Sequence, residues 1–473
     1  MTVEPNAKSD TPALPQGIRL TAFIGWSFMA LVSFHAAQIL GLGWLLIPCA
    51  YALIELSRAD TSRKVFYPML ALGFLFYAPQ LGFFWNIFHQ AAIVLWLILA
   101  FWIALFGLTL RLVRVRFGNG WMLALAPFIW TGLEYFRSEL YYLRFGWLTF
   151  GMAGNQMPGF DLSQLGVFGC GLVFVTLAAV HQRFGFCKTI IRIMYLTVIF
   201  LLVQLILPVI LPLGGRDIHG RAARIPVAGI QLEFPNDHQV LSTLNQARTK
   251  FPDTRLFMLS EYTFQTPPPQ SVRDWCASNQ VHLVVGGMEP LSNTNYYNTA
   301  YVIGTNGNIV FQQGKSVPIQ FFKDGLPAPE RKVWNSPWGK LGILTCYDLS
   351  YTRVVDDFVK QGAIALLNPT MDVSDWGEQQ HKLHSRVAPM RAAEYGIPIF
   401  RVASSGISQI VARTGRVLAS APFPGDGEII AGQLPLNAKP NLPLDRWLAP
   451  MCVGIAVLAF VASLIPRRKT NYE

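Results

Sequence analysis

The hydrophobic positions of this chain form long uninterrupted runs in its first half and at its carboxyl end, with shorter runs in between. A helix that crosses a membrane needs about 20 mostly apolar residues. An amphipathic helix on the surface of a soluble domain would instead carry polar residues along one face. The long runs therefore predict eight transmembrane helices. They lie at about residues 18–36, 38–55, 65–84, 91–110, 119–136, 161–181, 189–211 and 447–465.

The composition supports a membrane protein. Of the 473 residues, 52% are hydrophobic and only 14% are charged, whereas a typical soluble domain has roughly 25% charged residues. On a soluble protein the net charge of +11 would suggest a nucleic-acid partner. Here the basic residues form short clusters between the apolar runs, which is typical of cytoplasmic loops. The six cysteines are too few for a disulfide framework in a chain of this length.

The distribution of Lys and Arg in the short loops predicts the orientation in the membrane, because cytoplasmic loops carry an excess of both. One set of loops carries only Arg137 and Arg144. We therefore expect both termini in the cytoplasm, the segment 212–446 on the far face, and no cleaved signal peptide. The basic residues expected on the cytoplasmic side are Lys8, Arg19, Arg58, Arg63, Lys64, Arg111, Arg114, Arg116, Arg183, Lys188, Arg192, Arg467, Arg468 and Lys469.

From Ile225 onward, short β-rich runs alternate with polar stretches of helical character. Turn signals at 305–308 and 414–416 indicate two hairpins among them. Such a mixture of βα units and hairpins predicts one α/β domain with covered sheets. The predicted domains are a transmembrane domain of seven helices at 1–214, an α/β domain at 215–440, and a last transmembrane helix with a cytoplasmic tail at 441–473.

Three residues of complementary chemistry, Glu261, Lys315 and Cys346, each stand at the end of a short apolar strand. Active sites of α/β folds gather at the carboxyl edge of the sheet. There a carboxylate can take the proton of a thiol, and an ammonium can lower the pKa of that thiol and stabilise an oxyanion. Each residue alone is also typical of an ordinary structural role: a solvated glutamate, a surface lysine and a buried inert thiol.

Taken together, these residues resemble the carbon–nitrogen hydrolase (nitrilase) superfamily. The resemblance covers about residues 225–425 and implies an αββα sandwich with a Glu–Lys–Cys triad. In that triad Glu261 would be the general base and acid, Lys315 would stabilise the oxyanion, and Cys346 would be the nucleophile. The matching pieces are LSEYTF around Glu261, GKSVP around Lys315, GKLGILTCYD around Cys346, VVGGME at 284–289, YYNTAYVIGTNGNIV at 296–310 and MRAAEYGIPIFRVASSGIS at 390–408.

The membrane part narrows the resemblance to the apolipoprotein N-acyltransferase family. Eight spans with a nitrilase-like domain between the seventh and the eighth are similar to that family, as are APFIW at 126–130, Glu134 and FGWL at 145–148. The resemblance implies that an acyl chain passes from a phospholipid to the cysteine as a thioester. The chain then passes to the α-amino group of a diacylglyceryl-cysteine lipoprotein. The implied location is the bacterial inner membrane, and we expect a monomer with no cofactor and no nucleic-acid partner.

Further residues near the triad are expected to bind substrate or to support the site. Tyr347 and Asp348 follow the nucleophile, where the family usually carries Tyr-Glu. Phe321 and Phe322 form an aromatic pair that we expect in a mobile loop that contacts lipid.

The family usually carries a glutamate shortly after the lysine, and this chain has none in the run 317–322. Asp324 and Glu330 are the two acids that can take its place, and the sequence leaves open which one does. The departure keeps two other interpretations open. One is a membrane-tethered nitrilase-like amidase, which would use water as the acceptor, and the other is an inactive scaffold domain. The amidase is distinguished by a pocket that does not open toward lipid.

A metal site is not expected. His381 and His384 lie about one turn apart on a predicted helix, with Glu378 nearby, but no CxxC or HExxH pattern accompanies them.

Overall fold

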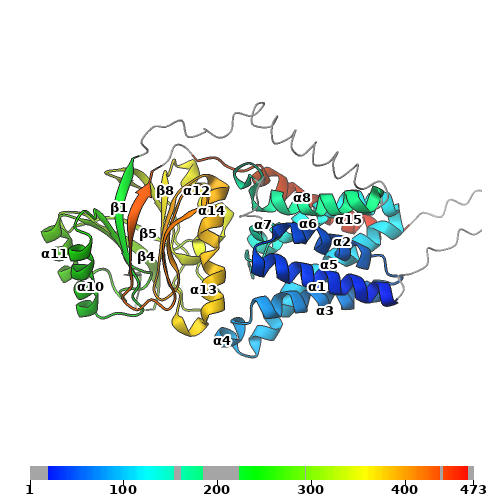
Figure 1. Ribbon diagram of the computed structural model, residues 1–473, viewed down its shortest axis with the longest axis horizontal. Helices are drawn as coiled ribbons and strands as arrows, with labels where there is room; N and C mark the ends of the chain where they lie inside the picture. Colours follow the sequence, from blue (N-terminus) through cyan, green and yellow to red (C-terminus); the bar gives the residue numbers. More distant parts are fainter. Residues whose placement is uncertain (1–19, 154–160, 185–222, 293, 437–439, 467–473) are drawn as a thin grey trace, which may run out of the picture.

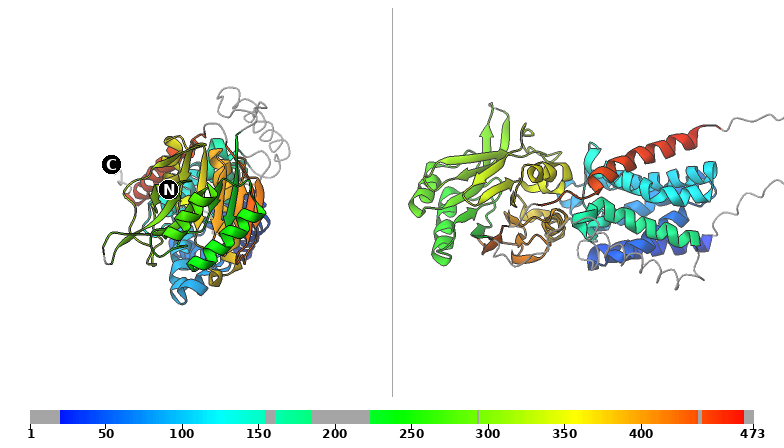
Figure 2. Two further views of the ribbon diagram at one scale, coloured as in Figure 1. Left: turned by 90° about the vertical axis from the view of Figure 1, so that its left-hand side faces the viewer. Right: turned by 90° about the horizontal axis from the view of Figure 1, so that it is seen from above.

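The computed structural model describes residues 20–153, 161–184, 223–292, 294–436 and 440–466. It has two parts that lie end to end, a bundle of helices and an α/β sandwich (Figures 1 and 2). The helices of the bundle are α1 (Leu20–Leu40), α2 (Leu46–Leu56), α3 (Ser62–Gln80), α4 (Phe84–Phe88), α5 (Ala91–Phe117), α6 (Asn119–Tyr135), α7 (Phe150–Ala153), α8 (Leu162–Phe184) and α15 (Asp445–Leu464).

Four of the described helices are long and apolar enough to cross a membrane: α1, α5, α8 and α15. Their outer faces expose large apolar side chains, such as Phe28 on α1 and Leu458 on α15, which water would not tolerate over so wide an area. Helices α2, α3 and α6 occupy three further predicted spans but do not reach the same length and hydropathy. The predicted span 189–211 lies outside the described residues, so the number of eight spans stays a prediction.

Of the basic residues predicted to be cytoplasmic, those that the structure describes gather at the end of the bundle that is remote from the sandwich. There Arg58 donates to Gln182 on α8 at 3.2 Å, and Arg114 on α5 donates to the carbonyl of Ala59 at 3.4 Å. The carboxyl end of α1 lies at the opposite end of the bundle. The other predicted cytoplasmic cations, Lys8, Arg19, Lys188, Arg192, Arg467, Arg468 and Lys469, lie outside the described residues.

The second part is the predicted αββα sandwich, which the structure confirms. Its two six-stranded sheets run in the orders β12-β1-β2-β3-β4-β5 and β11-β10-β9-β8-β7-β6. The strands of the first sheet are β1 (Arg224–Ile230), β2 (Leu256–Met258), β3 (His282–Pro290), β4 (Tyr296–Ile303), β5 (Ile309–Gly314) and β12 (Ile429–Pro435). Those of the second are β6 (Val333–Ser336), β7 (Gly339–Ile343), β8 (Ala365–Thr370), β9 (Ile399–Ala403), β10 (Ser408–Val411) and β11 (Val417–Ala421).

Parallel pairs form the middle of each sheet, β1-β2-β3 in one and β7-β8-β9 in the other. The two hairpins predicted from turn signals are confirmed as the antiparallel pairs β4-β5 and β10-β11. Helices α10 (Asp237–Lys250) and α11 (Gln270–Asn279) cover the first sheet. Helices α12 (Thr352–Lys360), α13 (Glu378–Ser385) and α14 (Val387–Tyr395) cover the second sheet on the side that faces the bundle (Figure 1).

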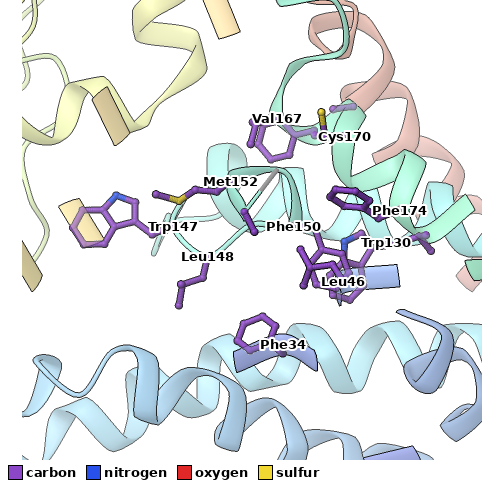
Figure 3. Packing of buried hydrophobic residues seen from close by; sticks show 14 of the residues in the cluster. Phe34, Leu46, Trp130, Trp147, Leu148, Phe150, Met152, Val167, Cys170 and Phe174 are labelled. Atoms are coloured by element: carbon purple, nitrogen blue, oxygen red, sulfur yellow. The ribbon is translucent and has the colours of Figure 1, made fainter. Parts of the chain in front are cut away.

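The helices of the second sheet share one continuous apolar core with the bundle. Phe358 on α12 and Val387 on α14 belong to the same buried cluster as Phe34 on α1 and Phe174 on α8. Trp147 lies at the edge of this cluster nearest the sandwich (Figure 3). The two parts therefore form a packed junction rather than two domains on a flexible tether.

Buried polar contacts fix the relative position of the two parts across this junction. Glu394 on α14 accepts hydrogen bonds from the backbone of Val167 at 3.0 Å and from Arg446 at 3.1 Å, and it also pairs with Arg391. Glu139, just after α6, accepts from the backbone N–H of Thr352 at 2.8 Å. A buried charge contributes to stability only while its partners remain in place.

The junction generates a prediction for stability. Glu394→Gln keeps the size of the side chain but deprives the buried guanidinium groups of Arg391 and Arg446 of their shared carboxylate. We expect the free energy of unfolding to fall by about 3–5 kcal/mol, measured by denaturant titration of the full chain in detergent.

Glu378→Gln is the matched control, because Glu378 pairs with Lys382 on an exposed helix face. We expect it to leave the unfolding midpoint unchanged. Equal midpoints for the two variants would contradict the role given to the junction.

Candidate active site

The structure brings Glu261, Lys315 and Cys346 together at the edges of the two sheets. Glu261 lies shortly after β2, Lys315 directly after β5, and Cys346 begins the 3-10 turn Cys346–Ser350 after β7. All three side chains are buried, with at most 1% of each residue exposed. The triad thus draws two of its members from one sheet and the nucleophile from the other.

Tight backbone turns present these side chains. Cys346 has φ +51° and Tyr262, next to Glu261, has φ +53°, in the left-handed region that non-glycine residues rarely adopt. The turn at Glu261 also needs Gly286 on β3, because a Cβ there would lie 2.5 Å from the Cα of Glu261. Such strain is retained where the surrounding contacts hold it, and it is common at functional sites.

Lys315 is held between two carboxylates. Its Nζ lies 2.8 Å from Oε1 of Glu261 and 2.7 Å from Oδ2 of Asp324. Nδ2 of Asn298 on β4 donates to the same two residues, at 2.6 Å and 2.8 Å. One ammonium and one amide therefore hold together two carboxylates that would otherwise repel each other.

The environment shifts the pKa values of both members of this pair. Burial of Glu261 raises its pKa above the ordinary value, although the ammonium of Lys315 opposes the shift. Burial disfavours the charged form of Lys315, but the carboxylates of Asp324 and Glu261 outweigh it and raise its pKa well above the ordinary value. Lys315 is therefore a permanent cation, while Glu261 can exchange a proton nearer neutral pH.

Of the two acids left open by the sequence, Asp324 lies in the site and Glu330 does not. Besides Lys315, Asp324 accepts from the hydroxyl of Tyr262 at 2.8 Å and from the backbone N–H of Ile319 at 2.6 Å. Glu330 instead pairs with Lys332 at the surface, where both side chains are about two-thirds exposed.

The thiol of Cys346 is buried and protonated at rest. Burial and the nearby carboxylate of Glu261 raise its pKa well above the ordinary value, and Lys315 only partly offsets them. Sγ lies 3.6 Å from the carbonyl oxygen of Met371, whose N–H donates to Oε2 of Glu261 at 2.8 Å. Met371 therefore connects nucleophile and base, and the thiol needs that base to become a nucleophile.

Asp348 ties the turn of the nucleophile to the loop after the lysine. Its carboxylate accepts from the backbone N–H groups of Ser316 at 2.9 Å and Val317 at 2.8 Å. Burial raises its pKa to about 6. The neighbouring Tyr347 packs edge-on against Trp147 of the bundle, with ring centroids 5.6 Å apart.

A largely apolar cavity opens next to the thiol, at the junction of sandwich and bundle. Phe321 and Phe322 lie at its rim, 69% and 40% exposed, and both rings contact Phe88 of α4. The wall of the cavity contains residues of both the sandwich and the bundle, so the cavity exists only where these two parts meet. It is lined by Phe83, Phe84, Ile87, Phe88, Leu95, Ile98, Leu99, Leu143, Arg144, Phe145, Trp147, Pro318, Ile319, Gln320, Phe321, Phe322, Cys346, Tyr347, Tyr351, Trp376, Gln380 and His384.

Sequence reasoning missed Asn298, Tyr262 and the backbone of Met371. A signal existed for Asn298, which is a buried amide in the middle of the predicted strand that becomes β4. Across the described residues, no group of three or more His, Cys, Asp or Glu side chains could hold a metal ion.

Two family models match this chain. The carbon–nitrogen hydrolase model matches residues 257–438, and the model of the apolipoprotein N-acyltransferase N-terminal domain matches residues 26–180. The first covers the triad and most of the sandwich, and the second covers the bundle up to α8.

Curated relatives that are named apolipoprotein N-acyltransferase agree with both models. The protein of Rhizobium rhizogenes is 31% identical over 168 residues, which cover 30% of each chain. That of Rhizobium leguminosarum bv. trifolii is 31% identical over 233 residues, 42% of this chain and 41% of the relative. These two matches thus span less than half the length of the relatives.

The match to the protein of Shewanella oneidensis is weaker in identity but nearly complete in length, at 22% over 460 residues, 83% of this chain and 86% of the relative. The match therefore extends over both the bundle and the sandwich of this chain, in the same order along the relative. This chain is a membrane protein and belongs to the apolipoprotein N-acyltransferase family of the carbon–nitrogen hydrolase superfamily.

Proposed function

We propose that this protein is an N-acyltransferase that moves an acyl chain from a phospholipid, through a thioester on Cys346, to the N-terminal amine of a diacylglyceryl-cysteine lipoprotein. The observation that carries the proposal is the cavity, because the nucleophile faces an apolar space whose wall includes helices of the membrane part. An acyl chain fits such a wall, whereas a small polar amide gains nothing from it. The amidase and the inactive scaffold are therefore not favoured.

The first step loads the cysteine. Glu261 takes the proton of the Cys346 thiol, and the sulfur attacks the ester carbonyl of the phospholipid. The ammonium of Lys315 stabilises the negative charge that develops on the carbonyl oxygen. Glu261 then gives its proton to the departing glycerol oxygen, which leaves the acyl chain on sulfur as a thioester.

The second step transfers the acyl chain to the amine. The amine nitrogen attacks the thioester carbonyl, the C–N bond forms and the C–S bond breaks. The same Lys315 ammonium stabilises the second oxyanion, and the thiolate leaves with a proton returned through Glu261. One site can serve both steps because donor and acceptor occupy it in turn.

The proposed orientation places the sandwich on the periplasmic face of the inner membrane and both termini in the cytoplasm. The basic end of the bundle, remote from the sandwich, supports it. Both substrates are lipids whose reactive groups lie near the headgroup layer, which is where a cavity at the junction would meet them. We propose that the protein acts as a monomer. Tyr347, Asp348, Phe321 and Phe322 are proposed to line or support the site.

The proposal predicts a covalent intermediate. After incubation of the full chain in detergent with a phospholipid, we expect a mass increase of one acyl group on Cys346, which hydroxylamine removes because it cleaves thioesters. Cys346→Ala should show no such adduct. An unmodified cysteine in an enzyme that hydrolyses small amides would contradict acyl transfer and favour the amidase.

The second prediction concerns the acid after the lysine. A base works only when deprotonated, so thioester formation should fall as the pH falls through the pKa of Glu261. The charge of Asp324 helps to raise that pKa, so Asp324→Asn should move the acidic limb of the pH–rate profile to lower pH. The rate of thioester formation at the plateau of this profile should also fall by about tenfold or more, because the base is weaker and Lys315 is less well held.

Glu330→Gln serves as the matched control for Asp324→Asn, and we expect it to leave both the limb and the plateau in place. An acidic limb that shifts in Glu330→Gln, or stays fixed in Asp324→Asn, would argue against the assignment of Asp324.

A further inference from the structure

A second buried polar cluster borders the same cavity and has no part in the mechanism given above. Nδ1 of His384 on α13 lies 2.7 Å from Oδ1 of Asp372, which follows β8. Nη2 of Arg401 on β9 lies 2.5 Å from Oδ2 of Asp372, and Nε2 of Gln380 donates to Oδ1 at 3.1 Å. At most 3% of each of these residues is exposed.

This arrangement fixes the tautomer of His384. Burial would raise the pKa of Asp372, but His384 and Arg401 outweigh it and hold that pKa well below the ordinary value. Nη2 of Arg401 also lies 3.2 Å from Nδ1 of His384. The contact of Nδ1 with the carboxylate of Asp372 is shorter, at 2.7 Å, and a carboxylate only accepts, so Nδ1 of the neutral imidazole carries the hydrogen and Nε2 keeps its lone pair. Within the described residues Nε2 has no hydrogen-bond partner.

The imidazole belongs to the wall of the cavity that Cys346 also lines. The indole of Trp147 packs against its ring with centroids 5.0 Å apart. Asp372 directly follows Met371, the residue that contacts both the thiol and Glu261. One strand end, that of β8, therefore connects the triad to the Asp372–His384 pair.

The second step has a proton requirement that the triad alone does not meet. An α-amino group has a pKa of about 8, so at neutral pH the acceptor arrives mostly as an ammonium without a lone pair. It must lose one proton before it attacks the thioester and a second one as the C–N bond forms. Glu261 can take only one of them, and that proton must return to the sulfur of Cys346.

We propose that His384 is the base that removes the first of these protons, an inference that rests on the proposed transfer to an amine. Nε2 takes a proton from the ammonium, which leaves a free amine and an imidazolium. The amine then attacks the thioester, its second proton passes through Glu261 to the departing sulfur, and the imidazolium releases its proton to water. Asp372 acts as a positioning residue, since it holds the ring and stabilises the imidazolium.

The titratable and charged groups around His384 are consistent with this role. On the cluster side they are Asp372, Arg401 and His381, and across the cavity they are the groups of Cys346, Tyr347, Tyr351 and Arg144. Burial lowers the pKa of His384, although Asp372 opposes the shift. The ring is therefore neutral at pH 7 and able to accept a proton.

The test separates the two steps on the full chain in detergent. The enzyme is first loaded from a phospholipid with labelled acyl chains. A synthetic peptide whose amino-terminal cysteine carries a diacylglyceryl group is then added, and loss of the thioester is followed in a single turnover between pH 6 and pH 10. Parallel samples without peptide measure hydrolysis.

In His384→Asn the side-chain amide can still donate to Asp372 but offers no base. We expect the thioester to form at the rate of the unaltered protein. Transfer at pH 7 should slow by about tenfold, because only about a tenth of an amine with a pKa of about 8 is then unprotonated. The deficit should shrink as the pH rises past about 8, because the amine then arrives without its extra proton. His384→Gln is the second variant if the first does not fold.

His381→Asn is the matched control, because His381 lies on the same helix, is equally buried and stacks on Phe423. Any loss that it causes should not depend on pH. The inference is overturned if both His384 variants transfer at the unaltered rate, or if their loss is constant with pH as in the control. Failure of the unaltered protein to form a thioester would instead overturn the proposed function.

Discussion

The site depends on one buried ammonium. Lys315 is almost fully enclosed, and a charge in that position is tolerated only because Glu261 and Asp324 both lie within 3 Å of it. Glu261 follows β2, Asp324 lies in the loop after the lysine, and Lys315 itself follows β5, so the ammonium holds three segments of the first sheet together at one point. The hydrogen bond from Met371 to Glu261 then fixes the second sheet, with its nucleophile, to the first.

The second constraint is the junction with the bundle. The cavity beside Cys346 has no complete wall within the sandwich, because α4, the start of α5 and Trp147 supply much of its apolar lining. Buried contacts such as those of Glu394 and Glu139 therefore do more than hold two parts together. They set the shape of the space in front of the thiol, which couples the stability of the junction to the chemistry.

Local patterns, namely apolar strands and the residues that end them, predicted an α/β domain and the candidates Glu261, Lys315 and Cys346. The sandwich and the roles within the triad came from the resemblance to the carbon–nitrogen hydrolases. The sequence left open the choice between Asp324 and Glu330, since a loop brings only one of two nearby acids back to Lys315 and no local pattern encodes that return. His384 was examined only as a metal ligand, because its partner Asp372 lies twelve residues away on another element. The apolar run 38–55 predicted a spanning helix, but the helix that forms there, α2, has only 11 residues, because apolar composition alone does not set the length of a helix.

Glu261 and Asp372 are the two carboxylates next to Met371, and their different surroundings give them different roles in proton transfer. Burial raises the pKa of Glu261 more than the ammonium of Lys315 lowers it, which lets Glu261 carry a proton back and forth. Asp372 is equally buried, but the guanidinium of Arg401 and the ring of His384 keep it ionised. Similar groups in different surroundings thus take different roles. A thiol gives up one proton when it is loaded, whereas an ammonium acceptor must lose two. A site that performs both reactions therefore has use for one carboxylate that titrates and for another that stays charged beside an imidazole.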